Sequence, residues 1–303
     1  MSWETALDER IRCCLPELKW LRGEPCAKHT SFRVGGPAKR MAFPKTAEEL
    51  TVLDGLLREL GVRRVVLGNG TNVLCPDEGL DAVMIVTGEM KEVRLENGTE
   101  LVADAGVSLA RLAAEALRAG LTGLEFAHGI PGSVGGGVVM NAGAYESSLS
   151  DVLAEVTALF PDGVRTLPAG ELRLSYRHSL FTEQPEATVL GARFRLGPGE
   201  SASIRARMDE LAERRKASQP LELPGAGSTF KRPEGHFAGR LIEDCGLKGT
   251  RVGGAEVSTK HAGFLVNTGG ATCADVLALI ETVQKTVFEQ TGVKLEPEVR
   301  ILR

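Results

Sequence analysis

The chain has 303 residues, of which 43% are hydrophobic and 25% are charged, and its formal net charge is −4. This composition is typical of a globular protein with a sizeable core and excludes a largely disordered chain. Lysine and arginine are scattered among acidic residues, so the sequence lacks the basic surface of a nucleic-acid-binding protein and the polybasic anchor of a membrane-associated one. The charged N-terminus is unlike a signal peptide, and no apolar run approaches the roughly 18 residues of a membrane helix. We therefore expect a cytoplasmic protein with a small-molecule partner.

The six cysteines and five histidines of the chain show neither C-x-x-C nor paired ligand spacing. The sequence therefore predicts no metal site and no redox dithiol. We expect the cysteines to be buried free thiols, and the adjacent Cys13 and Cys14 not to bridge each other, because a disulfide between neighbours strains the peptide.

The predicted elements alternate between helices and short strands, which indicates an α+β fold. In the first third, the chain is expected to be helical up to Pro16. Thr46 and Glu49 then form a capping-box pattern that opens a helix with leucines at helical spacing. Strands are predicted at 64–67 and from residue 82, the latter followed by a hairpin around the Asn97-Gly98 turn.

The rest of the chain continues this pattern. Ser108 is expected to cap a helix through Leu117, and a strand near 152–160, a turn at Asp162-Gly163 and a strand near 188–196 follow. A charged helix near 200–217 leads to a hinge at Pro220 and Pro224. The last part is predicted to contain strands around 226–230 and 251–266, a helix from Thr272 to about Gln290, and a closing strand at 293–302.

The stretch from Gly129 to Tyr145, GIPGSVGGGVVMNAGAY, carries six glycines around one apolar run. Glycine is useful where another group must approach the main chain closely, so this stretch predicts backbone pressed against a bound phosphate or ring system. A glycine-lined turn between packed elements is the alternative, and it would account for two or three of the glycines.

A second glycine loop, Gly68-Asn69-Gly70-Thr71-Asn72, directly follows the strand at 64–67. Its backbone amides are suited to an anion-binding nest, although a tight structural turn explains the same residues. The dinucleotide fingerprint is excluded because Val73 stands where its third glycine should be, and no P-loop pattern occurs.

Three polar clusters are candidates for chemistry. Arg177 lies in the partly apolar segment LSYRHSLF, where a buried guanidinium needs an anionic partner; a structural salt bridge would satisfy it equally well. Ser228 lies on a glycine-preceded bend with Lys231 nearby, in a pattern that is not G-x-S-x-G. Glu296 and Glu298 are two residues apart on a predicted strand and are expected to share one face, which is also common for a solvated face.

The motifs taken together closely resemble the UDP-N-acetylenolpyruvoylglucosamine reductase (MurB) family of bacterial cell-wall synthesis. The resemblance runs in order from about residue 27 to the C-terminus and is carried by HTSFRVGGPA (29–38), VLGNGTNVL (66–74), GLEFAHGIPGSVGG with MNAGAY (123–145), SYRHSLF (175–181), GSTFKRP (227–233) and LEPEVRIL (295–302).

The resemblance implies a two-lobed FAD-binding domain of the vanillyl-alcohol-oxidase type and a smaller α+β substrate-binding domain. The expected boundaries are an N-terminal extension at 1–26, the FAD domain at 27–198 and the substrate domain at 199–303. The resemblance also implies which residues bind FAD: Gly68, Asn69, Gly70, Thr71, Asn72, Gly129, Ile130, Pro131, Gly132, Ser133, Gly135, Gly136, Asn141, Ala142 and Gly143.

The family reaction implies NADPH as the reductant of FAD and a UDP-sugar as substrate. Hydride passes from reduced FAD to C3 of the enolpyruvyl group, and charge develops at C2 and in the adjacent carboxylate. By the resemblance, Arg177 and Glu298 polarise that carboxylate, Ser228 gives the proton to C2, and Tyr176 and Lys231 bind substrate. We expect a monomer.

Two departures from the family pattern are visible. Glu146 and Ser147 stand where relatives often carry glycine, and the only tyrosines are Tyr145 and Tyr176. The chain therefore resembles the shorter branch of the family, which lacks a tyrosine lid loop. Two rival interpretations are an alcohol or sugar oxidase of the same flavin superfamily and a nucleotide-sugar sensor without turnover.

Overall fold

The computed structural model describes residues 2–303, which form two compact units that alternate along the chain. The first unit comprises the residues up to Leu21, Arg40–Asn69 and Ala82–Arg214. The second comprises Arg22–Lys39, Gly70–Asp81 and Arg215–Arg303. Within the described residues, no helix combines the length and the apolar character that crossing a bilayer requires.

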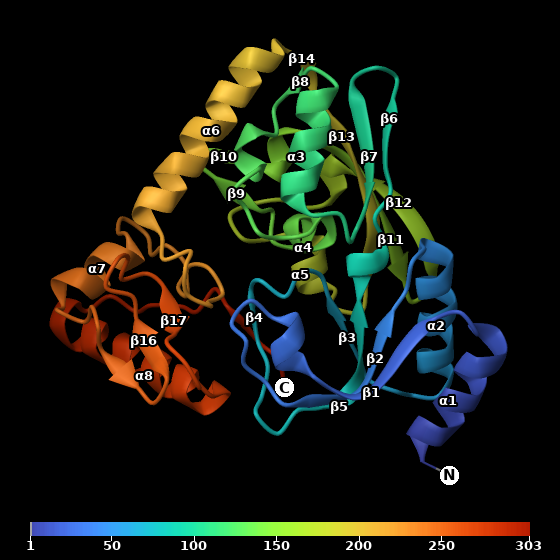
Figure 1. The fold of residues 1–303 in the computed structure, drawn as a ribbon, viewed down its shortest axis with the longest axis horizontal. Coiled ribbons are helices and arrows are strands. Elements are labelled where there is room, and N and C mark those ends of the chain that lie inside the picture. The colour runs from blue at the N-terminus through green and yellow to red at the C-terminus, as the bar shows by residue number, and fades with distance from the viewer. Residues whose placement is uncertain (1) are drawn as a thin grey trace. The chain divides into compact units, whose positions relative to one another are not determined.

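The N-terminal helices of the first unit pack on each other (Figure 1). They are α1 (Trp3–Cys14) and α2 (Ala47–Glu59), and their leucines share one core. Thr46 Oγ1 accepts the Glu49 N–H as predicted, but the Glu49 carboxylate accepts from Lys45 N at 2.7 Å. One sheet here has the strand order β1 (Lys19–Pro25), β2 (Pro37–Phe43), β5 (Leu80–Val86), β3 (Arg64–Leu67), with β3 and β5 parallel.

The other lobe of the first unit is built on a five-stranded antiparallel sheet. The turn residues Asn97 and Gly98 both have positive φ, and with Thr99 they form a three-residue loop between the paired residues Glu96 and Glu100. Ser108 caps α3 (Leu109–Arg118) as predicted. The strands, in sheet order, are β12 (Gly163–Pro168), β11 (Leu153–Phe160), β13 (Thr188–Arg195), β7 (Glu100–Asp104) and β6 (Val93–Glu96). The helices are α3 (Leu109–Arg118), α4 (Val134–Val139) and α5 (Leu180–Glu183).

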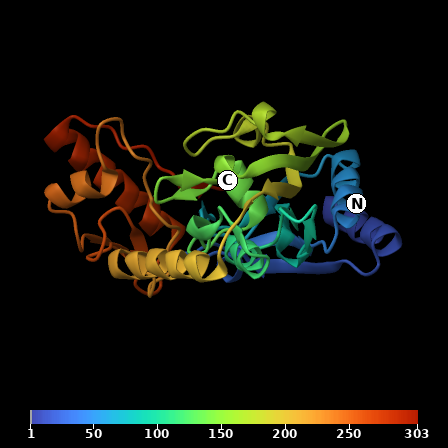
Figure 2. The same cartoon turned by 90° about the horizontal axis from the view of Figure 1, so that it is seen from above.

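Two short strand pairs complete this lobe. β8 (Leu121–Thr122) pairs with β14 (Gly197–Pro198), and β9 (Gly143–Ala144) pairs with β10 (Ser147–Ser148). The predicted charged helix is confirmed as α6 (Ser201–Ser218), a single straight rod in Figure 2.

The second unit has its own apolar core, in which α8 (Cys273–Thr291) and α7 (Ala238–Asp244) pack with a three-stranded sheet. Its strands are β15 (Arg251–Val252), β16 (Ala255–Val257) and β17 (Leu265–Asn267). The predicted strand at 226–230 is wrong, because that segment makes only isolated bridges at Gly225 and Phe230. The predicted closing strand is largely wrong too: it is reduced to β18 (Arg300–Ile301), which pairs in parallel with β4 (Val73–Leu74).

The predicted α+β fold with two lobes before the C-terminal part is confirmed by this arrangement. The four-stranded and five-stranded sheets are the two larger sheets of the first unit, and a three-stranded sheet packs with helices in the second.

Candidate functional site

Gly68 and Asn69, the first residues of the shorter glycine loop, lie beside the longer glycine loop in the first unit. Gly68 directly follows β3, and a Cβ at this position would overlap Ser133 Oγ of the other loop. Asn69 Nδ2 donates to the Pro131 carbonyl at 3.2 Å. Ser133 is 1% exposed, so the contact is fixed by packing. The side chains and glycines at this junction therefore hold the loops together.

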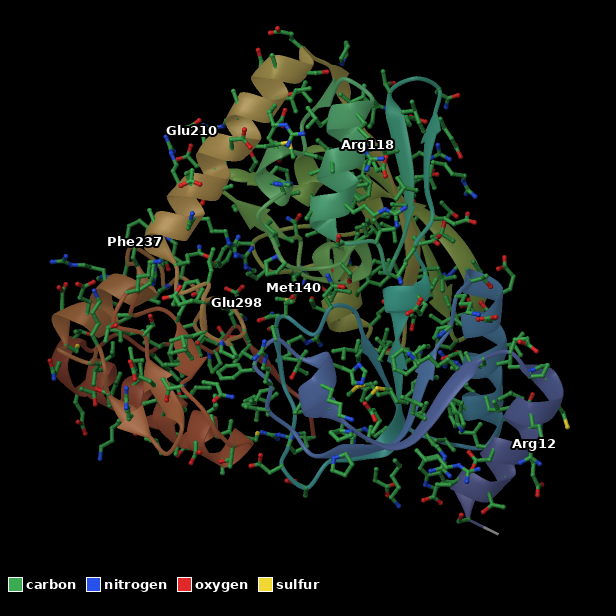
Figure 3. The ribbon with its side chains drawn as sticks, in the orientation of Figure 1. Arg12, Arg118, Met140, Glu210, Phe237 and Glu298 are labelled. Atoms are coloured by element: carbon green, nitrogen blue, oxygen red, sulfur yellow. The ribbon has the colours of Figure 1, made fainter. Side chains whose placement is uncertain are left out.

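Helix α4 is a glycine helix that sequence reasoning missed. Ser133 caps it by accepting from Gly136 N, and Met140 ends it (Figure 3). A Cβ on Gly135 would lie 3.0 Å from Ala105 Cβ, and one on Gly137 would lie 2.9 Å from Leu149 Cδ1. Packing against protein thus explains these two glycines, as expected for glycines that lie between packed elements. Gly136 differs, because only Ser133 Oγ at 3.5 Å lies near its Cβ position and the residue is exposed.

In the second unit, Gly70 is also pressed against protein. A Cβ there would overlap the His29 carbonyl, and Ser31 N donates to Gly70 O at 3.0 Å. Within the described residues, the main-chain N–H groups of 69–72 donate to no backbone carbonyl. The glycines and asparagines of this loop thus bind protein, while consecutive amides are left to form an anion-binding nest.

Arg177 lies on a tight turn with a left-handed backbone. Ser175 and His178 exchange two main-chain hydrogen bonds of 3.2 Å, and the φ of Arg177 is +55°. Non-glycine residues adopt this region at a cost and often at functional sites. The guanidinium lies 5.1 Å from the centre of the Tyr176 ring, and that tyrosine is 57% exposed. The turn therefore presents Arg177 and Tyr176 together.

Both ends of this turn are anchored to the segment around α4. Asn141 Nδ2 donates to the Ser175 carbonyl at 3.1 Å, and Ser179 Oγ donates to the Val139 carbonyl at 2.7 Å. Asn141 is only 6% exposed and has a φ of +41°. The Asn141 side chain therefore supports the Arg177 turn. Sequence reasoning also missed Ser179, for which the S-x-x-T capping pattern was the available signal.

Ser228 and Glu298 lie on neighbouring segments of the second unit. Glu298 N donates to the Thr229 carbonyl at 2.8 Å, and Phe230 bridges to Pro297. Ser228 Oγ donates to the Phe230 carbonyl at 3.1 Å, while Thr229 and Phe230 are buried and hold the segment in place. Glu298, labelled in Figure 3, is half-buried. The predicted serine and glutamate are thus brought close through their backbones.

Glu296 has a different environment from Glu298. Its carboxylate accepts from Lys231 Nζ at 2.6 Å, and its side chain is 70% exposed. Because 295–299 is not a strand, the expectation that the two glutamates share one strand face is wrong. Lys231 therefore has a carboxylate partner in its own unit.

The hairpin at the end of the long glycine stretch carries the departure from the family pattern. Tyr145 and Glu146 are the two central residues between β9 and β10, with φ of +54° and +69°. A two-residue turn with both values positive favours glycine. Tyr145 is fixed by a hydrogen bond from its hydroxyl to the Leu211 carbonyl at 3.1 Å, whereas Glu146 is exposed.

The cysteines are free, but not all of them are buried. Cys26, Cys75 and Cys273 are buried, whereas Cys13 and Cys14 are exposed because the last turn of α1 faces solvent. Burial raises the pKa of the Cys273 thiol to about 11. Among residues 2–303, no three His, Cys, Asp or Glu side chains are grouped as a metal site would require.

Comparison with known proteins matches both parts of the chain. Residues 219–302 match the family model described as UDP-N-acetylenolpyruvoylglucosamine reductase, C-terminal domain, and residues 38–167 match an FAD binding domain. A UDP-N-acetylenolpyruvoylglucosamine reductase of Caldanaerobacter subterraneus subsp. tengcongensis is 47% identical over 297 residues, with 98% of each chain covered. The chain belongs to the UDP-N-acetylenolpyruvoylglucosamine reductase family.

Other members of the reductase family agree with this assignment. The reductase of Agathobacter rectalis is 49% identical over 301 residues, with 95% of each chain covered. The crystal structure of the Thermus caldophilus reductase (MurB) superimposes with a TM-score of 0.81 at 36% identity, covering 95% of this chain and 99% of that one. The predicted family and flavin fold are therefore confirmed.

Proposed function

We propose that the protein reduces the enolpyruvyl group of UDP-N-acetylglucosamine enolpyruvate with NADPH, giving UDP-N-acetylmuramate for peptidoglycan synthesis in the cytoplasm. As a member of the reductase family it is an FAD-dependent oxidoreductase. The proposal is supported above all by one observation: the segments that carry Ser228 and Glu298 are joined by the 2.8 Å bond from Glu298 N to Thr229 O.

The glycine loops fit a dinucleotide cofactor. The unpaired amides of 69–72 suit a pyrophosphate, and Gly136 leaves room above the backbone of α4. We propose that residues 68–72, 129–133, 135, 136 and 141–143 hold FAD, mainly through main-chain groups. When bound, FAD takes electrons from NADPH and supplies them to the enolpyruvyl group.

The polar residues are proposed to stabilise the developing negative charge and to supply a proton. Arg177 pairs with the substrate carboxylate as negative charge develops there, a task suited to a guanidinium presented by a strained, well-anchored turn. Glu298 polarises the same group, and Ser228 gives its hydroxyl proton to C2. A serine is a weak acid, but an enolate is a strong base, so a positioned hydroxyl suffices.

The remaining assignments extend this proposal. Residues 27–198 are proposed to bind FAD, and residues 199–303 the UDP-sugar, after an extension at 1–26. Tyr176 and Lys231 contact substrate, Lys231 by exchanging its Glu296 partner for a phosphate. The protein works as a monomer, without a tyrosine lid and without nucleic-acid or membrane partners.

The test is NADPH consumption by the FAD-loaded protein, with and without UDP-N-acetylglucosamine enolpyruvate, with oxygen uptake recorded in the same sample. We expect consumption that requires the sugar and uses little oxygen. Oxygen as the main acceptor, with no effect of the sugar, would establish an oxidase instead, and bound UDP-sugar without flavin would establish a sensor.

Ser228→Ala tests the proton donor separately. The variant should retain FAD and accept electrons from NADPH, but turn over the enolpyruvyl substrate at least 100-fold more slowly, as expected for the loss of a positioned acid. Near wild-type turnover would remove Ser228 from the mechanism and leave the rest of the proposal standing.

A further inference from the structure

Asn72 binds the backbone of the C-terminal segment at two points. Its carbonyl accepts from Arg300 N at 3.0 Å, and its side-chain Nδ2 donates to the Glu298 carbonyl at 3.2 Å. All three residues belong to the second unit. Asn72 of the glycine loop therefore hydrogen-bonds to the main chain on both sides of Val299.

These two hydrogen bonds extend the parallel pairing of β4 and β18, but one of them uses a different donor from a regular ladder. In the ladder, Arg300 pairs with Val73, Arg300 N bonds to Asn72 O, and Leu302 N bonds to Leu74 O. A regular parallel ladder extended by one step would join the Glu298 carbonyl to the main-chain N–H of Asn72. The side-chain amide of Asn72 makes that bond instead. The main-chain N–H of Asn72 is therefore not used in the ladder and can contribute to the anion-binding nest of the glycine loop.

Both main-chain polar groups of Glu298 are held by hydrogen bonds. Its N–H is held by the Thr229 carbonyl beside Ser228, and its C=O is held by Asn72. With both groups bonded, the direction of the Cα–Cβ bond is set, and with it the region that the carboxylate can reach. Catalytic groups must be held within about 0.5 Å of the productive geometry.

We infer that Asn72 is a positioning residue whose side-chain amide orients Glu298. Because this amide replaces the main-chain N–H of Asn72 in the ladder, that N–H is left for the cofactor anion. The inference rests on the proposed function, because it assumes that Glu298 acts on the substrate carboxylate. It assigns the Asn72 side chain to Glu298, and only the Asn72 main chain to FAD.

The test separates the two half-reactions in the FAD-loaded protein under anaerobic conditions. Flavin reduction by NADPH and flavin reoxidation by UDP-N-acetylglucosamine enolpyruvate are followed by stopped-flow absorbance for wild type, Asn72→Ala, Glu298→Gln and the double variant. Misplacement by about 1 Å can cost 10²-fold. We expect Asn72→Ala to slow reoxidation by about 10–100-fold while reduction by NADPH changes by less than about threefold.

Coupling distinguishes positioning from a general structural role. If Asn72 acts through Glu298, its loss slows reoxidation by less than about threefold further in the Glu298→Gln background. Asn69→Ala is the matched control, since Asn69 also donates to a carbonyl at 3.2 Å, but to Pro131. Its effect should multiply with that of Glu298→Gln.

Asn72→Asp keeps the shape and removes the donor, so it tests the hydrogen bond even where the alanine variant folds poorly. Flavin content and melting temperature establish folding for each protein. Two outcomes would overturn the positioning role alone. One is a double variant slowed by the product of the two single-variant factors, and the other is a reoxidation rate within threefold of wild type in both Asn72 variants. Unchanged reoxidation in Glu298→Gln would overturn the proposed role of Glu298, and the inference with it.

Discussion

Two glycines in helices should respond in opposite directions to alanine. Gly55 lies in α2 with nothing within 4 Å of its Cβ position, whereas a Cβ on Gly135 of α4 would lie 3.0 Å from Ala105 Cβ and 3.2 Å from Ala105 O. Gly135 N also donates to Ala105 O at 2.8 Å. The added methyl group must therefore push α4 away from its own hydrogen-bond partner.

The magnitudes follow from two competing terms. Alanine is favoured over glycine inside a helix by about 1 kcal/mol, and overpacking a rigid site costs about 1–3 kcal/mol. Ala105 is 1% exposed and presents backbone atoms, so the higher half of that range applies to Gly135. We expect Gly55→Ala to stabilise the protein by about 1 kcal/mol and Gly135→Ala to destabilise it by about 1–2 kcal/mol.

The assay is calorimetric unfolding of both variants with saturating FAD, combined with FAD titration of the apoprotein. For a domain of this size, about 1 kcal/mol shifts the melting temperature by roughly 2–4 °C, so the variants should differ by several degrees. Gly135→Ala should also bind FAD more weakly, because α4 follows the loop at Ser133. Equal stabilisation by both substitutions would refute the packing argument for the α4 glycines.

Three further predictions concern single carboxylates. Glu298→Gln should slow reoxidation by substrate at least tenfold, whereas Glu296→Gln should change it by less than about threefold; equal damage would undercut the choice between them. Glu146→Gly should raise stability by about 1 kcal/mol by relieving a left-handed backbone, and a lower melting temperature would contradict this. The Thr272 N–H holds the pKa of Asp275 below its ordinary value, so the stabilisation by its carboxylate is present above the unfolded pKa near 4 and is lost as pH falls through the lower folded pKa. Asp275→Asn should therefore melt below wild type at pH 7, with a difference that shrinks below about pH 4; a constant difference would count against the cap.

Local signals predicted much of the fold. Thr46, Ser108 and Thr272 each cap a helix by accepting the N–H three residues on, as their positions before apolar periodic segments indicated. The Asn97-Gly98 turn also lies where predicted, between paired strands, whereas the second turn is shifted by one residue to Pro161-Asp162, because Gly163 pairs with Phe160. These features depend on neighbours within a few residues, so the sequence contains their cause.

Features that depend on distant partners were missed. Three consecutive glycines disfavour a helix, yet α4 forms because Val134 N and Gly135 N bond to Val107 O and Ala105 O. The apolar alternation at 293–302 favoured one strand, but only Arg300–Ile301 finds a strand partner, β4. Whether a segment becomes a strand depends on what lies beside it.

The sequence by itself determined the family, the flavin chemistry and the identity of the candidate groups, because ordered motifs and side-chain types are written along the chain. Only the tertiary structure decided what each group binds. Asn72 and Glu298 are 226 residues apart, and Asn141 and Ser175 are 34 apart. Hydrogen bonds over such separations form only after the chain has folded, so no local pattern specifies that the asparagines of the glycine loops support the segments that carry Glu298 and Arg177.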